Sequence, residues 1–233
     1  MSEAQFVGEL LRLRRSSIWS ASGAPPGYHR PLILAGGFGL PTATLAPLAR
    51  WLRAGDWDVH IADLGWNAGC GEQAVAQLEA LIGSVAIRGK PVTLIGHSRG
   101  GLLGRVAGVR AQEKLATLVT VCTPWTVGPP DRLGVKLAGR AIRQARALGY
   151  RGLGSIDCAT APCCASLRVD VDEKPSAMWT LLWSRADSVV GHDWRTNGPD
   201  AIVDIGTSHL GAVLSEPAWV AIGNALRLPP RPR

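Results

Sequence analysis

The chain has 233 residues, of which 46% are hydrophobic and 18% are charged, a composition that excludes the disordered and fibrous classes of protein. This length is enough for one α/β domain with a sizeable core, and we expect a single domain over residues 1–233. The formal net charge is +7, but the basic residues are spread along the chain with no long basic run, which argues against a nucleic-acid partner.

The first 30 residues are expected to form a helix followed by a loop. Residues 4–15 have the apolar spacing of an amphipathic helix, and their arginines lie toward its C-terminal end, where they suit the helix dipole. The sequence shows neither the apolar core of a secretory signal nor a run long enough to cross a bilayer, so we expect a cytoplasmic location.

Short apolar runs alternate with helical patterns along the rest of the chain. The runs have the length and composition of strands buried on both faces, and they lie at 31–35, 57–62, 91–95, 115–122, 178–184 and 201–205. Apolar residues at helical spacing between and after these runs predict helices over 45–52, 73–85, 101–109 and 212–228. The alternation predicts the α/β class, with a doubly wound, mainly parallel sheet.

Between residues 126 and 177 the alternation lapses, which predicts a short cap or lid inserted over the carboxyl edge of the sheet. A helix with a basic face is expected over 132–151, followed by a glycine- and cysteine-rich loop to Pro175. The basic face is either solvated or in contact with a membrane surface or an anionic substrate. It consists of Arg132, Lys136, Arg140, Arg143, Arg146 and Arg151.

Five cysteines are an odd number, which excludes a complete disulfide framework. Cys70 and Cys122 stand singly and are expected to be buried thiols. Cys158, Cys163 and Cys164 lie close together in the sequence, which leaves a small loop-closing disulfide open. A zinc site is less favoured, because no second C-x-x-C and no nearby histidine completes a tetrahedral set.

Residues 96–100, Gly-His-Ser-Arg-Gly, join the apolar run at 91–95 directly to a glycine-rich helix. Glycine stands two residues to either side of Ser98, where a Cβ would strike the neighbouring strand or helix. A turn this tight strains the backbone of Ser98 and lifts its Oγ clear of the sheet, as a nucleophile requires. The alternative is a glycine-rich turn with an incidental serine.

A serine hydroxyl is a poor nucleophile unless a base takes its proton and a carboxylate orients the base. His209 follows the strand at 201–205, and Asp187 follows the strand at 178–184. Both are therefore expected at the same edge of the sheet as Ser98.

Other residues could fill these roles or flank them. His192 is the alternative base and Asp193 the alternative acid, because both lie in the loop region that holds Asp187. His97, next to the serine, is expected to point away from the cleft and pack beneath the turn.

An oxyanion requires two preorganised donors. The expected donors are the backbone amides of Arg99, which follows the serine, and of Phe38, in the loop Gly36–Gly39 after the first strand. A plain glycine turn is the alternative for this loop. Gly37 and Trp125 are candidate substrate contacts, and core packing is the equal alternative for Trp125.

From Pro31 to Leu228 the chain resembles the small bacterial lipase and esterase branch of the α/β-hydrolase superfamily. The resemblance implies a serine esterase that works through an acyl-enzyme without a cofactor or metal. Two positions differ: Gly36-Gly37 stands where such lipases usually carry His-Gly, and Ser188 follows Asp187 where glycine is common. The matching segments are Gly36–Gly39, Leu64–Asn67, Gly96–Gly100, Arg185–Asp187 and Ser208–Gly211.

The expected function is hydrolysis of a hydrophobic carboxylic ester, either a small molecule or a lipid-like substrate. Ser98 would attack the carbonyl, His209 would carry the proton and Asp187 would orient the imidazole. The alternatives are an acyltransferase or thioesterase with the same three residues, or a non-catalytic hydrolase-like binding protein. Nothing in the sequence indicates the oligomeric state.

Overall fold

Six strands form one parallel sheet in a computed structural model that describes residues 5–86, 90–125, 144, 161–190 and 198–229. The order across the sheet is β2-β1-β3-β4-β5-β6. The predicted α/β class and doubly wound parallel sheet are therefore confirmed. The strands are β1 (Pro31–Ala35), β2 (Asp58–Ile61), β3 (Val92–His97), β4 (Leu115–Val121), β5 (Met178–Trp183) and β6 (Ala201–Asp204).

The strand order reverses once, between β1 and β3. The chain passes from β1 to β2 on one side and then returns to place β3 on the other side of β1. The helices that follow β1 and β3, α2 and α4, consequently pack on opposite faces of the sheet, and ligands of open α/β sheets bind at the carboxyl ends of the strands at such a reversal. The loop Gly36–Gly39 and the turn at Ser98 lie at this position.

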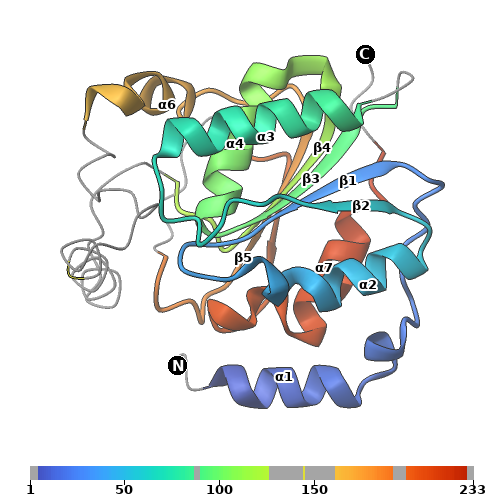
Figure 1. Ribbon diagram of the computed structural model, residues 1–233. Helices are drawn as coiled ribbons and strands as arrows, with labels where there is room; N and C mark the ends of the chain where they lie inside the picture. The colour runs from blue at the N-terminus through green and yellow to red at the C-terminus, as the bar shows by residue number, and fades with distance from the viewer. Residues whose placement is uncertain (1–4, 87–89, 126–143, 145–160, 191–197, 230–233) are drawn as a thin grey trace.

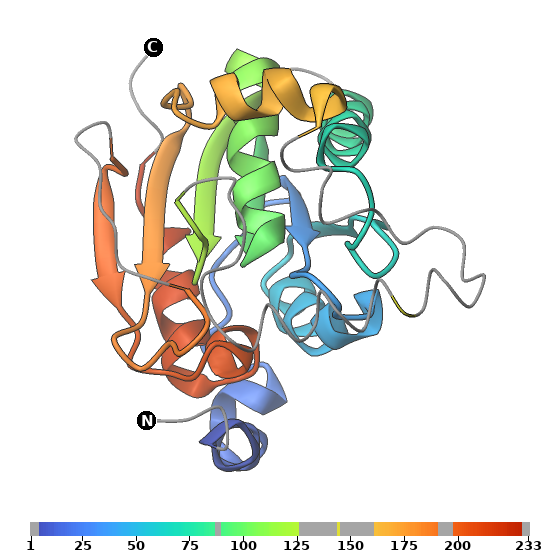
Figure 2. The same cartoon turned by 90° about the vertical axis from the view of Figure 1, so that its left-hand side faces the viewer.

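Helices cover both faces of the sheet (Figures 1 and 2). One buried cluster joins the sheet to α1 (Phe6–Arg15), α2 (Ala46–Ala54) and α7 (Glu216–Ala225). A second cluster joins the opposite face to α3 (Gly71–Val85), α4 (Arg99–Ala111) and α6 (Ala165–Asp170). The short 3₁₀ helices are η2 (Ser17–Ser20), η3 (Thr42–Leu45), η5 (Gln112–Lys114), η7 (Pro162–Cys164) and η8 (Leu210–Val213).

The continuously apolar sequence of β1 follows from its burial on both faces of the sheet. Leu32 and Leu34 face the cluster with α2 and α7, whereas Ile33 and Ala35 face the cluster with α3 and α4. All four side chains are buried, because consecutive residues of a strand point to opposite faces and both faces are covered.

Two sequence-based expectations need correction in the second half of the chain. The predicted loop that runs to Pro175 contains η7 and α6, and Leu167 of α6 is buried in the cluster with α3 and α4. The last helix starts at Glu216 rather than at residue 212, because η8 precedes it and Pro217 lies in its first turn, where proline is tolerated.

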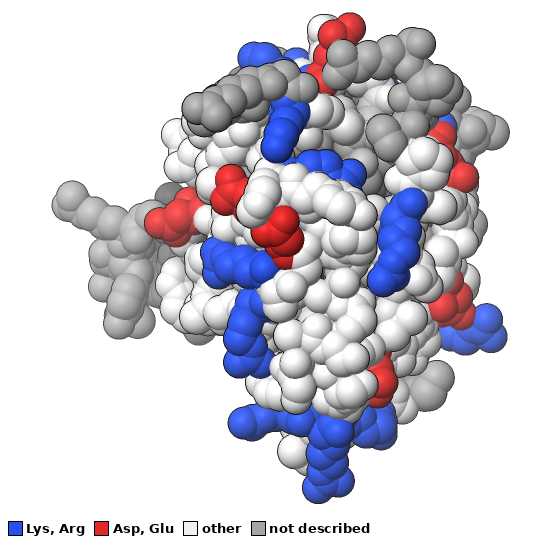
Figure 3. All heavy atoms as spheres, turned by 90° about the vertical axis from the view of Figure 1, so that its right-hand side faces the viewer, with Lys and Arg blue, Asp and Glu red and all other residues white. Residues whose placement is uncertain are grey.

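The basic helix expected over 132–151 lies outside the described residues, as does most of the predicted cap at 126–177. Basic side chains elsewhere gather at one end of the molecule, over α1, whose last turn carries Arg12, Arg14 and Arg15 (Figure 3). Among the described helices, none has both the length and the apolar character needed to span a bilayer.

Replacement of Trp219 by alanine tests the core on the α7 side of the sheet. Its side chain is fully buried, stacks near Trp51 and Trp19, and donates an indole hydrogen bond to the Val213 carbonyl at 2.9 Å. We expect Trp219→Ala to lower the free energy of unfolding by about 3–5 kcal/mol in urea denaturation. The neighbouring exposed Val220→Ala should change it by less than about 0.5 kcal/mol, and equal effects of the two variants would contradict this packing.

Candidate active site

Ser98 occupies the single position between β3 and α4, in a backbone conformation that L-residues rarely adopt. Its φ is +52° and its ψ is −124°. Such a conformation costs on the order of 1–3 kcal/mol and persists only where the surroundings enforce it. Here the Ser98 N–H donates to the Val121 carbonyl at 2.8 Å, and α4 begins at the next residue.

The two glycines of the Gly-x-Ser-x-Gly pattern are required by close backbone approach. A Cβ at Gly96 would lie 2.5 Å from the Cα of Gly101, and a Cβ at Gly100 would lie 2.4 Å from the carbonyl oxygen of Gly36. Because both neighbours are backbone atoms, no side-chain movement could make room. The steric reason expected from the sequence is therefore confirmed.

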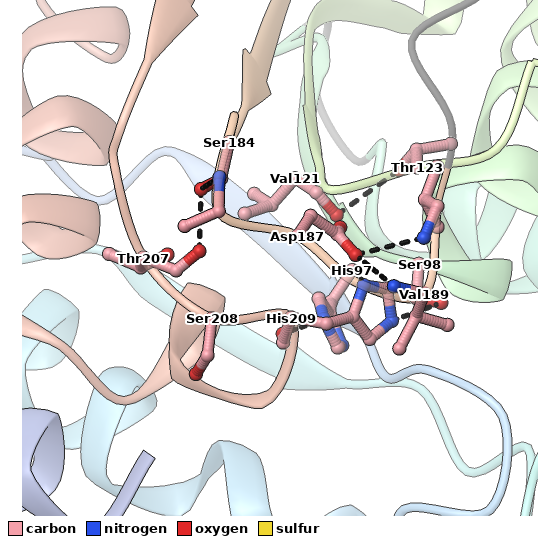
Figure 4. Close-up of polar contacts among 12 residues, drawn as sticks. His97, Ser98, Val121, Thr123, Ser184, Asp187, Val189, Thr207, Ser208 and His209 are labelled. Atoms are coloured by element: carbon pink, nitrogen blue, oxygen red, sulfur yellow. Dashed lines mark hydrogen bonds and ion pairs between the residues drawn. The ribbon is translucent and has the colours of Figure 1, made fainter. Parts of the chain in front are cut away.

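The structure brings Ser98, His209 and Asp187 into one hydrogen-bonded chain (Figure 4). Ser98 Oγ lies 3.0 Å from His209 Nε2, and His209 Nδ1 lies 2.8 Å from Asp187 Oδ2. All three side chains are buried. In this arrangement the hydroxyl donates to Nε2 while Nδ1–H donates to the carboxylate.

Asp187 is held as an anion that fixes the orientation of the imidazole. Burial raises its pKa, but the hydrogen bond and charge of His209 and the amides of Val190 and Val189 together bring the pKa below its ordinary value. These two amides donate to Asp187 Oδ1 at 2.8 and 2.7 Å, which leaves Oδ2 directed at the ring. The alternative residues His192 and Asp193 lie outside the described residues.

His97 packs beneath the turn, as its place in the sequence suggests, and also supports His209. Its Nε2–H donates to the His209 carbonyl at 3.0 Å, and the two rings lie 4.9 Å apart. Burial and the neighbouring His209 lower the pKa of His97 to about 3, so the ring is neutral at neutral pH.

Ser184, at the end of β5, ties together the loops that carry the acid and the base. Its hydroxyl donates a hydrogen bond to the Thr207 carbonyl and accepts one from the Ala186 N–H at 3.1 Å. The spacing between Asp187 and His209 is therefore set by direct contacts between their two loops.

The first helix of the chain also reaches the His209 loop. Glu9 of α1 is buried, and its carboxylate accepts the Ser208 amide at 2.9 Å and the Ser208 hydroxyl at 2.5 Å. The Ser208 hydroxyl in turn accepts the Gly211 amide at 3.0 Å. A buried anion on one side of the loop thus fixes the residue that precedes the imidazole.

The loop after β1 lies against the serine turn. A Cβ at Gly37 would lie 2.8 Å from His97 Nδ1 and 3.2 Å from Ser98 Cβ, so the loop passes close to the side chains of both residues. Asn67 Nδ2 donates to the Gly36 carbonyl, and the Arg99 guanidinium donates to Asn67. The side chain that follows the serine therefore braces this loop through Asn67.

Trp125 packs into the core cluster on the α4 side. Its ring stacks on Trp179 at 5.5 Å, and the Arg105 guanidinium lies 4.9 Å from its centre. This contact corresponds to the core-packing alternative that the sequence left open.

Two groups within the described residues have donor atoms close enough to hold a metal. One is Cys122, Asp187 and His209, which shares two residues with the hydrogen-bonded chain at Ser98, and the other is Cys70, Cys163 and Cys164. Cys122 is buried, as expected, whereas the burial expected for Cys70 is wrong, because Cys70 is only half-buried, beside Cys163 and Cys164. Cys158 lies outside the described residues.

The sequence did not single out Glu9 or Ser184. One feature of the sequence could have indicated a buried role for Glu9: it stands four residues before the buried Leu13 and so shares the core-facing side of α1. A carboxylate on that side requires a partner. The partner itself lies 199 residues away, and only the fold identifies it.

No family model matches the chain, and no curated protein matches its sequence. Solved structures do match its fold. One is from a study of the metagenome-derived lipolytic enzymes LipS and LipT, with 16% identity, 88% of this chain and 96% of that chain covered, and a TM-score of 0.61. A hydrolase from Oleispira antarctica has 13% identity, coverage of 88% and 93%, and a TM-score of 0.59. A thioesterase domain from the curacin biosynthetic pathway has 12% identity, coverage of 87% and 92%, and a TM-score of 0.57.

The chain has the α/β-hydrolase fold. In an α/β-hydrolase the reactive side chains follow the order serine, acid, histidine along the chain, each at the carboxyl end of a strand. Ser98 after β3, Asp187 after β5 and His209 after β6 have this order and these positions.

The α/β-hydrolase fold places His97 where burial makes the protein acid-sensitive. Its folded-state pKa of about 3 lies below the unfolded value of 6.5, so the unfolded chain takes up a proton first as the pH falls. Between pH 6.5 and pH 5 this should lower the free energy of unfolding by on the order of 1.5 kcal/mol. Urea titrations of the wild type and His97→Gln check it, and an equal loss in both would contradict the assignment.

Glu9→Gln tests the contact between α1 and the His209 loop. The substitution keeps the size of the side chain but replaces the two charge-assisted bonds from Ser208, so we expect the free energy of unfolding to fall by about 1.5–3 kcal/mol. The control is Glu113→Gln, at an exposed glutamate in η5, which should change it by less than about 0.5 kcal/mol. An unchanged urea midpoint in Glu9→Gln would show that the contact contributes nothing.

Proposed function

We propose that the protein is a serine hydrolase that cleaves carboxylic esters through an acyl-enzyme. The observation that carries the proposal is the buried chain from Asp187 through His209 to the strained Ser98. Its distances are those at which a histidine can accept the serine proton during attack. The fold shared with lipolytic enzymes and a hydrolase supports the same reaction class.

In the proposed first step, Ser98 Oγ bonds to the ester carbonyl carbon while its proton moves to His209 Nε2. The carbonyl π electrons move to oxygen and form a tetrahedral oxyanion. Asp187 accepts the hydrogen bond from Nδ1–H and stabilises the positive imidazolium without itself becoming protonated.

The proposed oxyanion donors are the backbone amides of Arg99 and Phe38. Arg99 is the first residue of α4, where the helix dipole presents its positive end. The loop that holds Phe38 passes Ser98 at Gly37 and is anchored by the Gly39 amide on the Trp66 carbonyl at 2.7 Å. Two donors fixed before the reaction stabilise the developing charge without reorganising.

Collapse of the tetrahedral species breaks the bond to the leaving alkoxide, which takes the proton from His209 Nε2. Water then loses a proton to the same nitrogen and attacks the acyl carbon. Release of the acid returns the proton to Ser98 Oγ. We propose a hydrophobic ester as substrate, either a small molecule or a lipid-like molecule, with Gly37 beside its acyl group.

Thioester hydrolysis is the second candidate, because the same attack applies to a thioester carbonyl. A thioesterase domain is among the proteins that share the fold. Assays of an oxygen ester and a thioester with the same acyl group compare the two leaving groups directly. A higher kcat/KM for the oxygen ester than for the thioester supports the esterase.

Ser98→Ala should lower kcat for p-nitrophenyl esters by about 10⁴-fold or more, because it removes the nucleophile.

Asp187→Asn should lower kcat by on the order of 10⁴-fold, because the amide favours the wrong imidazole tautomer. A series of esters with increasing acyl length, assayed with the wild type, identifies the acyl group that fits.

The matched control is Ser84→Ala, which removes an exposed hydroxyl on α3 and should leave kcat unchanged. Fluorophosphonate labelling should appear in the wild type and in Ser84→Ala but not in Ser98→Ala. If a folded Ser98→Ala protein keeps its turnover and its label, the proposal is wrong. If the folded wild type shows neither, a non-catalytic binding protein becomes the better explanation.

A further inference from the structure

Three cysteine side chains meet at the beginning of α3. Cys70 directly precedes that helix, whereas Cys163 and Cys164 end η7, more than 90 residues later in the chain. The Sγ atom of Cys70 lies 3.9 Å from that of Cys163 and 3.7 Å from that of Cys164, and the last two lie 3.9 Å apart. The three sulfurs therefore form a nearly equilateral triangle.

The size of this triangle matches one face of a tetrahedral zinc site. Zinc–thiolate bonds of about 2.3 Å in tetrahedral geometry place neighbouring sulfurs about 3.8 Å apart. A disulfide would draw two of the sulfurs together and leave the third aside, whereas here the three separations are alike. Thiolates are also the ligands that thiophilic divalent cations prefer.

The surrounding structure holds the sulfurs in place without a metal. Leu167 of α6 is buried against Gly71, where a Cβ would lie only 2.9 Å from its Cδ1. Arg110 of α4 forms ion pairs with Glu72 of α3 at 2.5 Å and with Asp170 of α6 at 2.7 Å. The two segments that supply the cysteines are thus fixed to the same helix, which lowers the cost of assembling the site.

The Arg99 guanidinium and the N-terminus of α3 lie near this cluster. The Arg99 guanidinium and Cys164 Sγ each lie 3.7 Å from the Cβ position of Gly71, so both groups flank the same position at the start of α3. Cys70 caps the N-terminus of a 15-residue helix, where the dipole also favours negative charge. Three thiolates and one divalent cation carry a net charge of −1, which Arg99 can balance.

We propose that Cys70, Cys163 and Cys164 bind one Zn²⁺ through their thiolates. Cys164 is buried and Cys163 is exposed, so water can reach the site and would supply the fourth ligand. Each thiol releases its proton to solvent when its sulfur bonds to the metal. The bound ion would fasten η7 and α6 to α3.

Binding of Co²⁺ to the reduced, metal-free full-length chain tests the proposal, because cobalt takes the same ligands and absorbs light. We expect one Co²⁺ per chain, a thiolate-to-metal charge-transfer band, and displacement of the cobalt by one equivalent of Zn²⁺. Cys70→Ser and Cys163→Ser should each remove about one third of the band and weaken metal binding at least about tenfold.

Cys122→Ala is the matched control, because Cys122 belongs to the other candidate metal group, with Asp187 and His209. It should leave both the band and the affinity unchanged. Loss of the band in Cys122→Ala, its persistence in both serine variants, or its absence from the wild type would each overturn the proposal.

A measurement on the wild type covers the case in which a serine variant does not fold. Zn²⁺ should slow iodoacetamide alkylation of Cys70, Cys163 and Cys164, as followed by mass spectrometry, and a chelator should reverse the protection. Equal alkylation with and without Zn²⁺ would overturn the proposal.

Discussion

Between the last residue of β3 and the first residue of α4 the chain has only Ser98 in which to reverse its direction. The reversal requires a left-handed backbone at a residue with a side chain, and it brings the start of α4 so close to the sheet that Gly96 and Gly100 can carry no Cβ. The strained backbone is held in place because β3, at the centre of the sheet, pairs with β4 from Val92 to His97 and with β1 from Thr93 to Gly96. The centre of the sheet therefore holds the hydroxyl in place.

His209 depends on a different kind of support. It follows β6, an edge strand of four residues whose only neighbour within the described sheet is β5. Three side chains from elsewhere in the chain make up for the limited pairing of this edge strand. His97 donates to the His209 carbonyl, Ser184 donates to the Thr207 carbonyl, and Glu9 of α1 accepts the Ser208 amide hydrogen bond. The serine is fixed by its own strand, whereas the imidazole is fixed by side chains from elsewhere in the chain.

The sequence predicted the six strands and the convergence of Ser98, Asp187 and His209, for local reasons. The four central strands β1, β3, β4 and β5 are short apolar runs buried on both faces, as expected, whereas the edge strands β2 and β6 are partly exposed, with Ile202 and Val203 of β6 facing solvent. The Ser98 turn is recognisable from the glycines at fixed positions around it. Chain order and strand ends then bring Asp187 and His209 to the same edge of the sheet.

Contacts between distant segments could not be predicted in this way. The pairing of Glu9 with Ser208, and of Cys70 with Cys163 and Cys164, requires knowledge of which helix packs on which loop. Helix α6 was missed because it has only six residues, and its stability comes from packing rather than from an amphipathic pattern.

The position of these residues along the chain also matters during synthesis. A ribosome makes α1 and the Ser98 turn well before the loop that holds His209, which follows the serine by 111 residues. A nascent chain that ends before residue 208 thus contains Ser98 without His209. In the same chain Glu9 lacks Ser208, whose amide and hydroxyl donate to it in the folded protein. The hydrogen-bonded chain from Ser98 to Asp187 therefore forms only after the segment through His209 has been synthesised.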